Sequence, residues 1–192
     1  MRSNLPASSA LRLIWKCLKA RPAAMLCWAA ALSLALAGCS GGSAPPGEPT
    51  FYQNLATADA KLDAAAAASM ISGFRRNNGL SPVTVDPELM RFAGAQARAM
   101  ATRDKMDHNV LAPFADRIRK AGLGGSVAVE NISAGYHTLA EAFSGWRDSP
   151  PHRANMLNPG VTRLGIAAVY APSSKYKVFW ALVLAGPDRK HG

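Results

Sequence analysis

The chain has 192 residues, of which 49% are hydrophobic and 18% charged, and its formal net charge is +10. Five of its 22 basic residues and none of its 12 acidic residues precede Cys39, so the rest of the chain carries 17 basic against 12 acidic residues, or +5. These later basic residues are scattered and form no basic stripe with stacking aromatic residues, so we expect no nucleic-acid partner. The 154 residues from Cys39 onward fit one domain with its own core.

The first 38 residues have the composition of a secretory signal. Four basic residues between positions 12 and 21 precede an apolar stretch at 23–37 that one serine interrupts. This stretch is shorter than the roughly 20 residues of a membrane-spanning helix, and an uncleaved anchor helix is the alternative. It ends in Leu36-Ala37-Gly38-Cys39, which resembles the bacterial lipobox. The lipobox implies cleavage before Cys39 and diacylation of that cysteine. The lipid would anchor the protein to a bacterial membrane in the cell envelope, outside the cytoplasm, and in a Gram-negative cell to the outer membrane.

Cysteine usage and composition divide the chain further. Cys17 and Cys27 lie within the signal and Cys39 would carry the lipid, so no pair of cysteines remains for a disulfide. Glycine, serine and proline dominate the residues after Cys39, which is typical of a flexible linker. We therefore predict a signal peptide at 1–38, a flexible tether at 39–56 and a folded domain at 57–188.

Helical patterns fill the first part of this domain. Residues 59–77 are rich in alanine and end at a stop signal, Asn77-Asn78-Gly79. Asp86-Pro87-Glu88 is a strong helix start, with a capping aspartate, a proline at the first helical position and an early acid. The residues that follow at spacings of three and four form one helix face, which we predict to be core and nothing more: Leu89, Phe92, Ala93, Gln96, Ala97 and Met100. A third helix is predicted at 112–120.

Strand patterns dominate the second part. Residues 126–132 read as extended, with Glu130 on the same face as Ala128 and Ile132. Such a carboxylate either faces solvent, which is the commoner case, or is partly buried as part of a site. A helix is predicted at 138–148, and the β-branched and aromatic stretches 163–170 and 176–184 are predicted to form an antiparallel hairpin at the centre of a sheet. Helices followed by strands indicate an α+β fold.

The segment between the last helix and the hairpin is compositionally unusual. Residues 145–159 read Gly-Trp-Arg-Asp-Ser-Pro-Pro-His-Arg-Ala-Asn-Met-Leu-Asn-Pro. Ser149 is a candidate N-cap and prolines suit the first helical positions, so His152 is predicted in the first turn of a helix. The positive end of the helix dipole disfavours imidazolium there and leaves a neutral imidazole that is suited to bind a metal or accept a proton. The alternative is a histidine that merely completes the helix start.

Several spaced motifs together resemble the CAP superfamily, also called SCP/PR-1-like, in its short bacterial form. The matching residues lie between about 63 and 186: Met106-Asp107-His108, Pro113-Phe114, Asp116-Arg117-Ile118, Ala121-Gly122, Glu130-Asn131-Ile132, Ala134-Gly135, Trp146 to Asn158, Leu164-Gly165-Ile166-Ala167 and Trp180. The resemblance implies an α-β-α sandwich with a central antiparallel sheet flanked by helices. It also implies a surface cavity that holds two histidines and acidic residues.

Carried over by position, the cavity histidines are His108 and His152, and its first acid is Glu130. Many eukaryotic members have a second glutamate three residues after the tryptophan; here Ser149 holds that position and Asp148 lies beside it. We expect these five residues to line the binding cavity. Three residues are more apolar than the family's pattern and argue against a hydrolytic or strongly polar site: Val129, Ala181 and Leu182.

Two imidazoles and a carboxylate are able to hold Zn²⁺ and leave a fourth position open. We therefore expect His108, His152 and Glu130 as metal ligands and zinc as the cofactor. The resemblance implies lipid or sterol binding in some relatives and no single shared activity. We predict an envelope-anchored binding module with a lipid, sterol-like or other cell-envelope ligand. The alternatives are a metal-dependent hydrolase with Glu130 as its base and a structural protein with a vestigial cleft.

Overall fold

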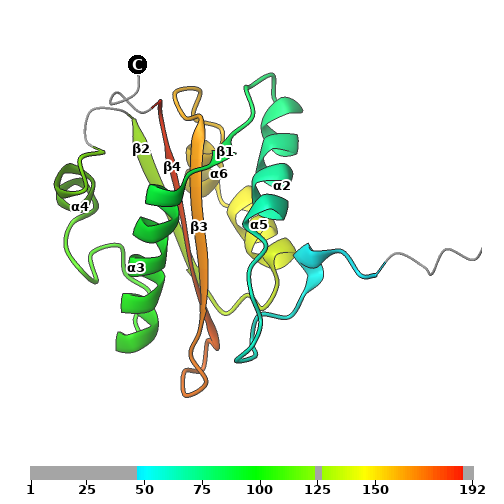
Figure 1. Ribbon diagram of the computed structural model, residues 1–192, viewed down its shortest axis with the longest axis vertical. Coiled ribbons are helices and arrows are strands. Elements are labelled where there is room, and N and C mark those ends of the chain that lie inside the picture. The colour runs from blue at the N-terminus through cyan, green and yellow to red at the C-terminus, as the bar shows by residue number, and fades with distance from the viewer. Residues whose placement is uncertain (1–46, 124–126, 188–192) are drawn as a thin grey trace, which may run out of the picture. The chain divides into compact units, whose positions relative to one another are not determined.

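The computed structural model describes residues 47–123 and 127–187. The predicted signal peptide, the lipobox and Cys39 lie outside these residues. Within the described residues, no helix is both long and apolar enough to cross a membrane. Figure 1 shows their helices and strands, which are the 3-10 helix η2 (Thr50–Tyr52), the α-helices α2 (Ala64–Arg76), α3 (Pro87–Arg103), α4 (Phe114–Lys120), α5 (Leu139–Asp148) and α6 (Pro150–Met156), and the strands β1 (Thr84–Val85), β2 (Ala128–Ala134), β3 (Arg163–Tyr170) and β4 (Val178–Ala185).

The four strands form one sheet in the order β1-β3-β4-β2. β4 pairs antiparallel with both β3 and β2, while β1 pairs parallel with β3. The predicted hairpin of β3 and β4 is therefore confirmed, and it lies at the centre of the sheet as expected. β1 and β2 are the two edge strands.

Helices cover both faces of this sheet, which confirms the predicted α-β-α sandwich (Figure 1). α3 and α4 pack on one face, and α2, α5 and α6 pack on the other. β4 lies between the two layers and is buried along its whole length. Trp146 of α5 meets Trp180 of β4 edge to face, with ring centroids 6.3 Å apart and planes at 87°. Such aromatic pairs stabilise a core beyond the area that they bury.

Two helices begin at an aspartate cap. Asp86 accepts hydrogen bonds from two backbone N–H groups of the first turn of α3, at 2.8 and 2.9 Å, as predicted. The same carboxylate forms an ion pair with Arg163 of β3 at 2.9 Å. α2 begins at Ala64, later than the predicted start at residue 59, because Asp63 caps the helix at that point. Both caps satisfy amide groups that would otherwise lack a partner.

The last residues of the predicted tether pack on the domain. η2 occupies positions that were expected to be flexible linker. Leu55 is 5% exposed and belongs to the core, and its N–H donates to the carbonyl of His137 at 2.7 Å. The ordered domain therefore includes residues that the linker-like composition of this segment did not indicate.

Close backbone contact fixes α3 on the sheet. Gly165 of β3 lies against the backbone of α3, and a Cβ atom at this position would collide with the carbonyl group of Leu89. Only glycine leaves room for so close an approach. The register of α3 on β3 therefore depends on the absence of a side chain here.

A buried arginine joins α2 to the segment that follows α6. Arg75 is 0% exposed, and its guanidinium donates to four backbone carbonyls. Nε donates to Ser81 at 2.8 Å, Nη1 to Met156 at 2.7 Å and Asn158 at 2.9 Å, and Nη2 to Val161 at 3.0 Å. These carbonyls include the C-terminal end of α6, where the helix dipole carries partial negative charge. Arg75 therefore holds α6 in place.

Candidate functional site

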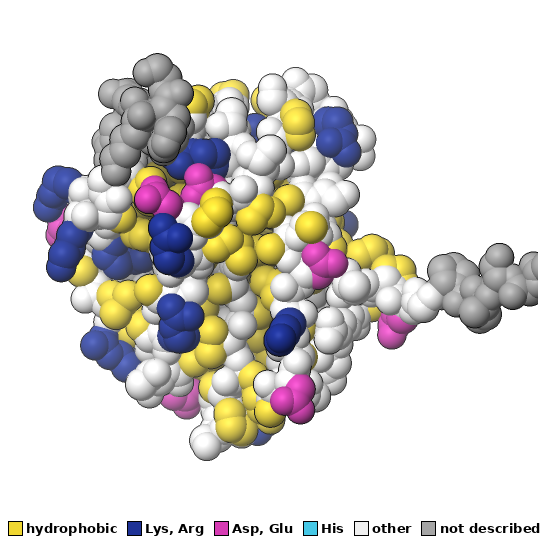
Figure 2. All heavy atoms as spheres, in the orientation of Figure 1, with side chains coloured by type: hydrophobic (Ala, Val, Ile, Leu, Met, Phe, Trp, Pro, Cys, Tyr) yellow, Lys and Arg dark blue, Asp and Glu magenta, His cyan; other side chains and the backbone are white. Residues whose placement is uncertain are grey.

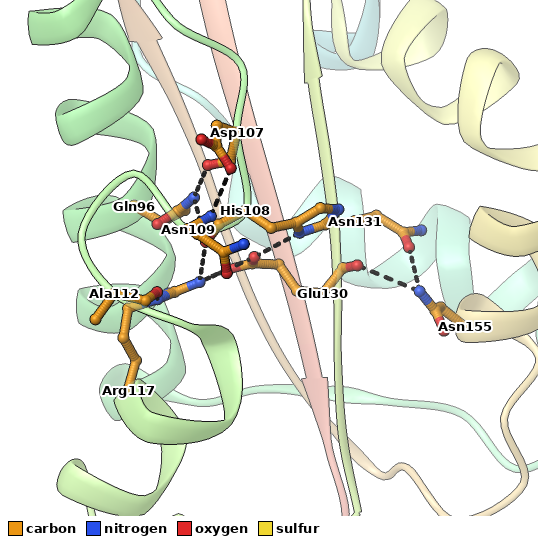
Figure 3. Close-up of polar contacts among 9 residues, drawn as sticks. All are labelled: Gln96, Asp107, His108, Asn109, Ala112, Arg117, Glu130, Asn131 and Asn155. Carbon is orange, nitrogen blue, oxygen red and sulfur yellow. Dashed lines mark hydrogen bonds and ion pairs between the residues drawn. The ribbon is translucent and has the colours of Figure 1, made fainter.

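The predicted cavity glutamate is buried on the edge strand β2. The Glu130 side chain is 1% exposed, and both its carboxylate oxygens are hydrogen-bonded (Figure 3). Oε1 accepts from His108 Nδ1 at 2.9 Å and from Arg117 Nη2 at 3.0 Å, and Oε2 accepts from Arg117 Nη2 at 2.9 Å. The expectation from strand alternation that Glu130 faces solvent is therefore wrong, because α4 and the loop before it cover this part of the sheet.

His108 shares this carboxylate from the loop between α3 and α4. The Glu130 carboxylate accepts from the guanidinium of Arg117 and also contacts Nδ1 of His108, so Nδ1 is the donor of this hydrogen bond and carries a proton. In the neutral ring, Nε2 then presents a lone pair. The His108 side chain is 47% exposed, so the ring is open to a ligand while Glu130 fixes its orientation.

Two further residues hold this loop and the carboxylate together. Gln96 of α3 is 0% exposed, and its Nε2 donates to the carbonyls of Asp107 at 2.9 Å and His108 at 3.4 Å. Arg117 donates through Nη2 to the carbonyl of His108 at 3.0 Å and through Nε to that of Ala112 at 3.1 Å. The loop that carries His108 is thus tied to both neighbouring helices (Figure 3).

The second predicted histidine is attached to the other side of β2. Asn131 follows Glu130 and therefore points to the opposite face of the sheet. Its Nδ2 donates to the carbonyl of His152 at 3.0 Å. Asn155 of α6 donates to Asn131 Oδ1 at 2.8 Å and to the carbonyl of Glu130 at 3.2 Å (Figure 3). The strand therefore brings the two histidine-bearing segments to one sheet edge from opposite layers.

His152 lies in the first turn of α6, as predicted, but its helix start differs from the expectation. Ser149 occupies the N-cap position without a side-chain capping hydrogen bond. The two prolines that follow hold positions N1 and N2 and have no N–H to donate, so of the two amides that a cap side chain reaches, at N2 and N3, only that of His152 is present. Burial lowers the pKa of His152, and the charge of His108 lowers that pKa further. His152 is therefore neutral at neutral pH, and its burial is the main cause.

Asp148 pairs with the neighbouring arginine of α5. Its carboxylate is exposed and pairs with Arg147, through Nε at 2.8 Å and Nη2 at 3.2 Å. The hydrogen bonds from Arg147 hold the pKa of Asp148 below its ordinary value. The apolar residues Ala181 and Leu182 are 0% and 1% exposed in the two core layers, so their apolar character reflects packing.

The contacts of Glu130 do not fit the role of a metal ligand that the sequence predicted for it. Its two oxygens face the guanidinium of Arg117, which cannot lose its charge in a protein. Across residues 47–123 and 127–187, no group of three or more His, Cys, Asp or Glu side chains is arranged to hold a metal ion. Zinc uptake through the two imidazoles stays a prediction.

Comparison with known proteins identifies the family of this chain. The family model of the Cysteine-rich secretory protein family, CAP, matches residues 68–184, which is more than half of the chain. The chain belongs to the CAP family. This assignment agrees with the fold and with the resemblance of the separate motifs. The matched residues include all five that we expected to line the cavity.

One relative of this CAP chain and two proteins of similar fold come from bacteria. The protein YkwD of Bacillus subtilis (strain 168) is 33% identical over 102 residues, which is 52% of this chain and 39% of YkwD, so the chain matches well under half of that protein. An extracellular SCP-domain protein of Bacillus anthracis str. Ames has a TM-score of 0.56 at 23% identity, over 64% of this chain and 40% of its own. An outer surface protein of Borrelia burgdorferi has a TM-score of 0.57 at 18% identity, over 67% of this chain and 98% of its own. These two structures, from an extracellular and a surface protein, share the fold.

Sequence reasoning overlooked two residues of the site. Gln96 was assigned to the apolar face of α3, although a buried amide on such a face needs partners and is itself a signal. Arg117 belongs to the motif Asp116-Arg117-Ile118, whose pattern indicates no role for it. The available signal was its position in a short predicted helix close to the apolar residues Phe114 and Ile118. In the structure its guanidinium lies 5.0 Å from the ring of Phe92 and 5.4 Å from that of Phe114.

Proposed function

We propose that this CAP domain is an envelope-anchored binding module. Lipidation of Cys39 would hold it on a bacterial membrane, outside the cytoplasm, and His108 and His152 would contact its ligand. The carrying observation is the Glu130–His108 hydrogen bond at 2.9 Å, which fixes one ring at the edge of β2 while leaving it 47% exposed. On the face drawn in Figure 2, basic side chains are scattered rather than gathered in a stripe, so the proposal includes no nucleic acid.

The hydrogen-bonding capacity of the two imidazoles narrows the chemistry of the ligand. Each neutral imidazole has one nitrogen without a proton, which accepts a hydrogen bond; in His108 this is Nε2, because Nδ1 donates to Glu130. The site therefore favours a ligand with hydroxyl or amide N–H groups. The buried Glu130 is already paired with Arg117 and adds no free charge for a cationic ligand. The headgroup of an envelope lipid or a sterol-like hydroxyl has this chemistry.

The binding role is tested with protein purified from its own envelope. Native mass spectrometry of the wild type is expected to show a co-purified molecule that is lost in the double variant His108→Ala, His152→Ala. His137→Ala is the matched control, because His137 is an exposed histidine in the turn before α5; this variant should retain the molecule. Equal retention by the double variant would refute a binding role for this site.

Anchoring is tested separately from binding. Wild-type protein is expected to take up radiolabelled palmitate and to sediment with membranes. Cys39→Ala should lose the label, because the thiol that carries the lipid is absent. A Cys39→Ala variant that is still labelled would refute lipidation at this residue.

A second candidate function is hydrolysis, and the Glu130–His108 pair favours it specifically. A carboxylate on Nδ1 orients an imidazole so that Nε2 accepts a proton from water or a hydroxyl. In this mechanism His108 is the base and Glu130 the residue that positions it, which reverses the role predicted for Glu130. Turnover of a peptide or ester substrate should then be lost in His108→Gln and reduced in Glu130→Gln.

A further inference from the structure

The strongest unexplained feature of the site is the arginine on its buried carboxylate. We propose that the guanidinium of Arg117 is a resident cation that takes the position of a metal ion at Glu130, so that this chain excludes divalent ions from that carboxylate. The inference rests on the contacts of the site and not on the identity of the ligand in the proposed function.

The charges of Glu130 and Arg117 already balance each other in the site. Glu130 is 1% exposed and Arg117 9% exposed, with Nη2 at 2.9 and 3.0 Å from the two oxygens. One positive and one negative charge therefore neutralise each other where little water reaches them. A divalent ion on the same carboxylate would lie within a few ångströms of the guanidinium, and like charges at that separation repel strongly in a buried site.

Further contacts fix the Arg117 guanidinium in its position. Its Nε and Nη2 also donate to the carbonyls of Ala112 and His108, at 3.1 and 3.0 Å. Its guanidinium lies over the rings of Phe92 and Phe114, at 5.0 and 5.4 Å from their centroids. Displacement by a metal would break all of these contacts together. Unlike a lysine, the arginine cannot yield by losing its proton.

The position of Arg117 separates this role from an ordinary ion pair of the fold. The guanidinium binds the carbonyl of His108 and the carboxylate that orients the His108 ring. Its contacts thus involve two of the three residues that were expected to hold zinc. Removing the guanidinium while keeping an apolar stem over the aromatic rings should expose Glu130 to a metal.

The test measures zinc affinity by calorimetry in wild type, Arg117→Met and Arg117→Met with Glu130→Gln. We expect Arg117→Met to bind zinc at least tenfold more tightly than wild type, and Glu130→Gln to remove that gain. Arg119→Met is the matched control: Arg119 lies on the same helix, its side chain is 76% exposed, and it pairs with Asp116. It should bind zinc as wild type does. Equal zinc affinity in wild type and Arg117→Met would overturn the proposal.

A measurement on the wild type covers the case in which Arg117→Met does not fold. Nitrogen-15 NMR of the imidazoles is recorded while zinc is added. The Nδ1 proton of His108 is expected to persist, because Glu130 stays bound to Arg117 and His108. Zinc uptake that removes this proton would overturn the proposal. Ligand retention is read in a different assay, so failure of this proposal is distinguishable from failure of the binding role.

Discussion

Arg75→Ala is expected to be among the most destabilising single changes in this domain. The guanidinium is 0% exposed and makes four hydrogen bonds of 2.7 to 3.0 Å to backbone carbonyls. Hydrogen bonds from a charged group are stronger than neutral ones, but the desolvation of the buried guanidinium offsets part of this gain, so each bond contributes about 1 kcal/mol net and their loss together costs about 4 kcal/mol. Domains unfold with about 5–15 kcal/mol in total, so the variant would lose a large share of its stability. At about 3 °C per kcal/mol for a domain of this size, Tm should fall by about 12 °C.

Urea unfolding followed by circular dichroism at pH 7 measures this loss. Arg76→Ala is the control, because Arg76 is the adjacent residue of α2 but is exposed. We expect the control to change the free energy of unfolding by less than about 0.5 kcal/mol, as is usual for surface substitutions. If Arg75→Ala were no less stable than Arg76→Ala, the carbonyl contacts would not stabilise the domain and the reasoning would be refuted.

Three further outcomes are expected. Gly165→Ala should destabilise the domain by more than about 2 kcal/mol in the same unfolding assay, because a Cβ atom there collides with the backbone of Leu89. The control Gly73→Ala in α2 should be neutral or stabilising, since its Cβ atom meets only the far end of an arginine side chain at 4.0 Å. Burial raises the pKa of Asp86, but the hydrogen bonds that the carboxylate accepts outweigh burial and hold that pKa below its ordinary value. The contribution of Asp86 to stability is therefore present at neutral pH and is lost as pH falls through the folded-state pKa. The substitution Asp86→Asn should cost about 1–2 kcal/mol at pH 7 and less at pH 2, measured by urea unfolding at both pH values. Because the charge of His108 helps to lower the pKa of His152, His108→Gln should raise that pKa in an NMR titration without restoring its ordinary value, and an unchanged or lower pKa would contradict the assignment.

The titration of His152 also sets the sign of a pH effect on stability. Its folded-state pKa lies below the ordinary value of about 6.5, so the unfolded chain binds more protons between the two values. Stability should therefore fall as pH drops through that window. The change is expected to be smaller in His108→Gln, where less of the lowering remains.

Elements with strong local signals were predictable from the sequence. The Asp86-Pro87 cap and the apolar residues that follow at helical spacing predicted the position of α3. A run of β-branched and aromatic residues predicted β3 with the same bounds as in the structure. β1 has only two residues, which is too short for an alternating pattern to indicate a strand. α2 was expected too early because an alanine-rich run has high helix propensity throughout, whereas the Asp63 cap decides where the helix begins.

The site was predictable in its residues but not in its contacts. The motifs named His108, Glu130 and His152, yet strand alternation only assigns Glu130 to a face and cannot tell what covers that face. Helix α4 covers this face, and its Arg117 reaches the Glu130 carboxylate through tertiary packing between segments that are 13 residues apart. A pairing of this kind depends on the register of a helix over an edge strand, which no local pattern encodes.

The hydrogen bond from Asn155 to the carbonyl of Glu130 has a consequence for association between molecules. An open strand edge is a template on which a second chain adds a strand and starts to aggregate. At β2 the amide of Asn155 occupies that backbone acceptor, and at the other edge β1 has too few residues to serve as a template. The helix that carries His152 therefore also discourages strand addition from a neighbouring molecule.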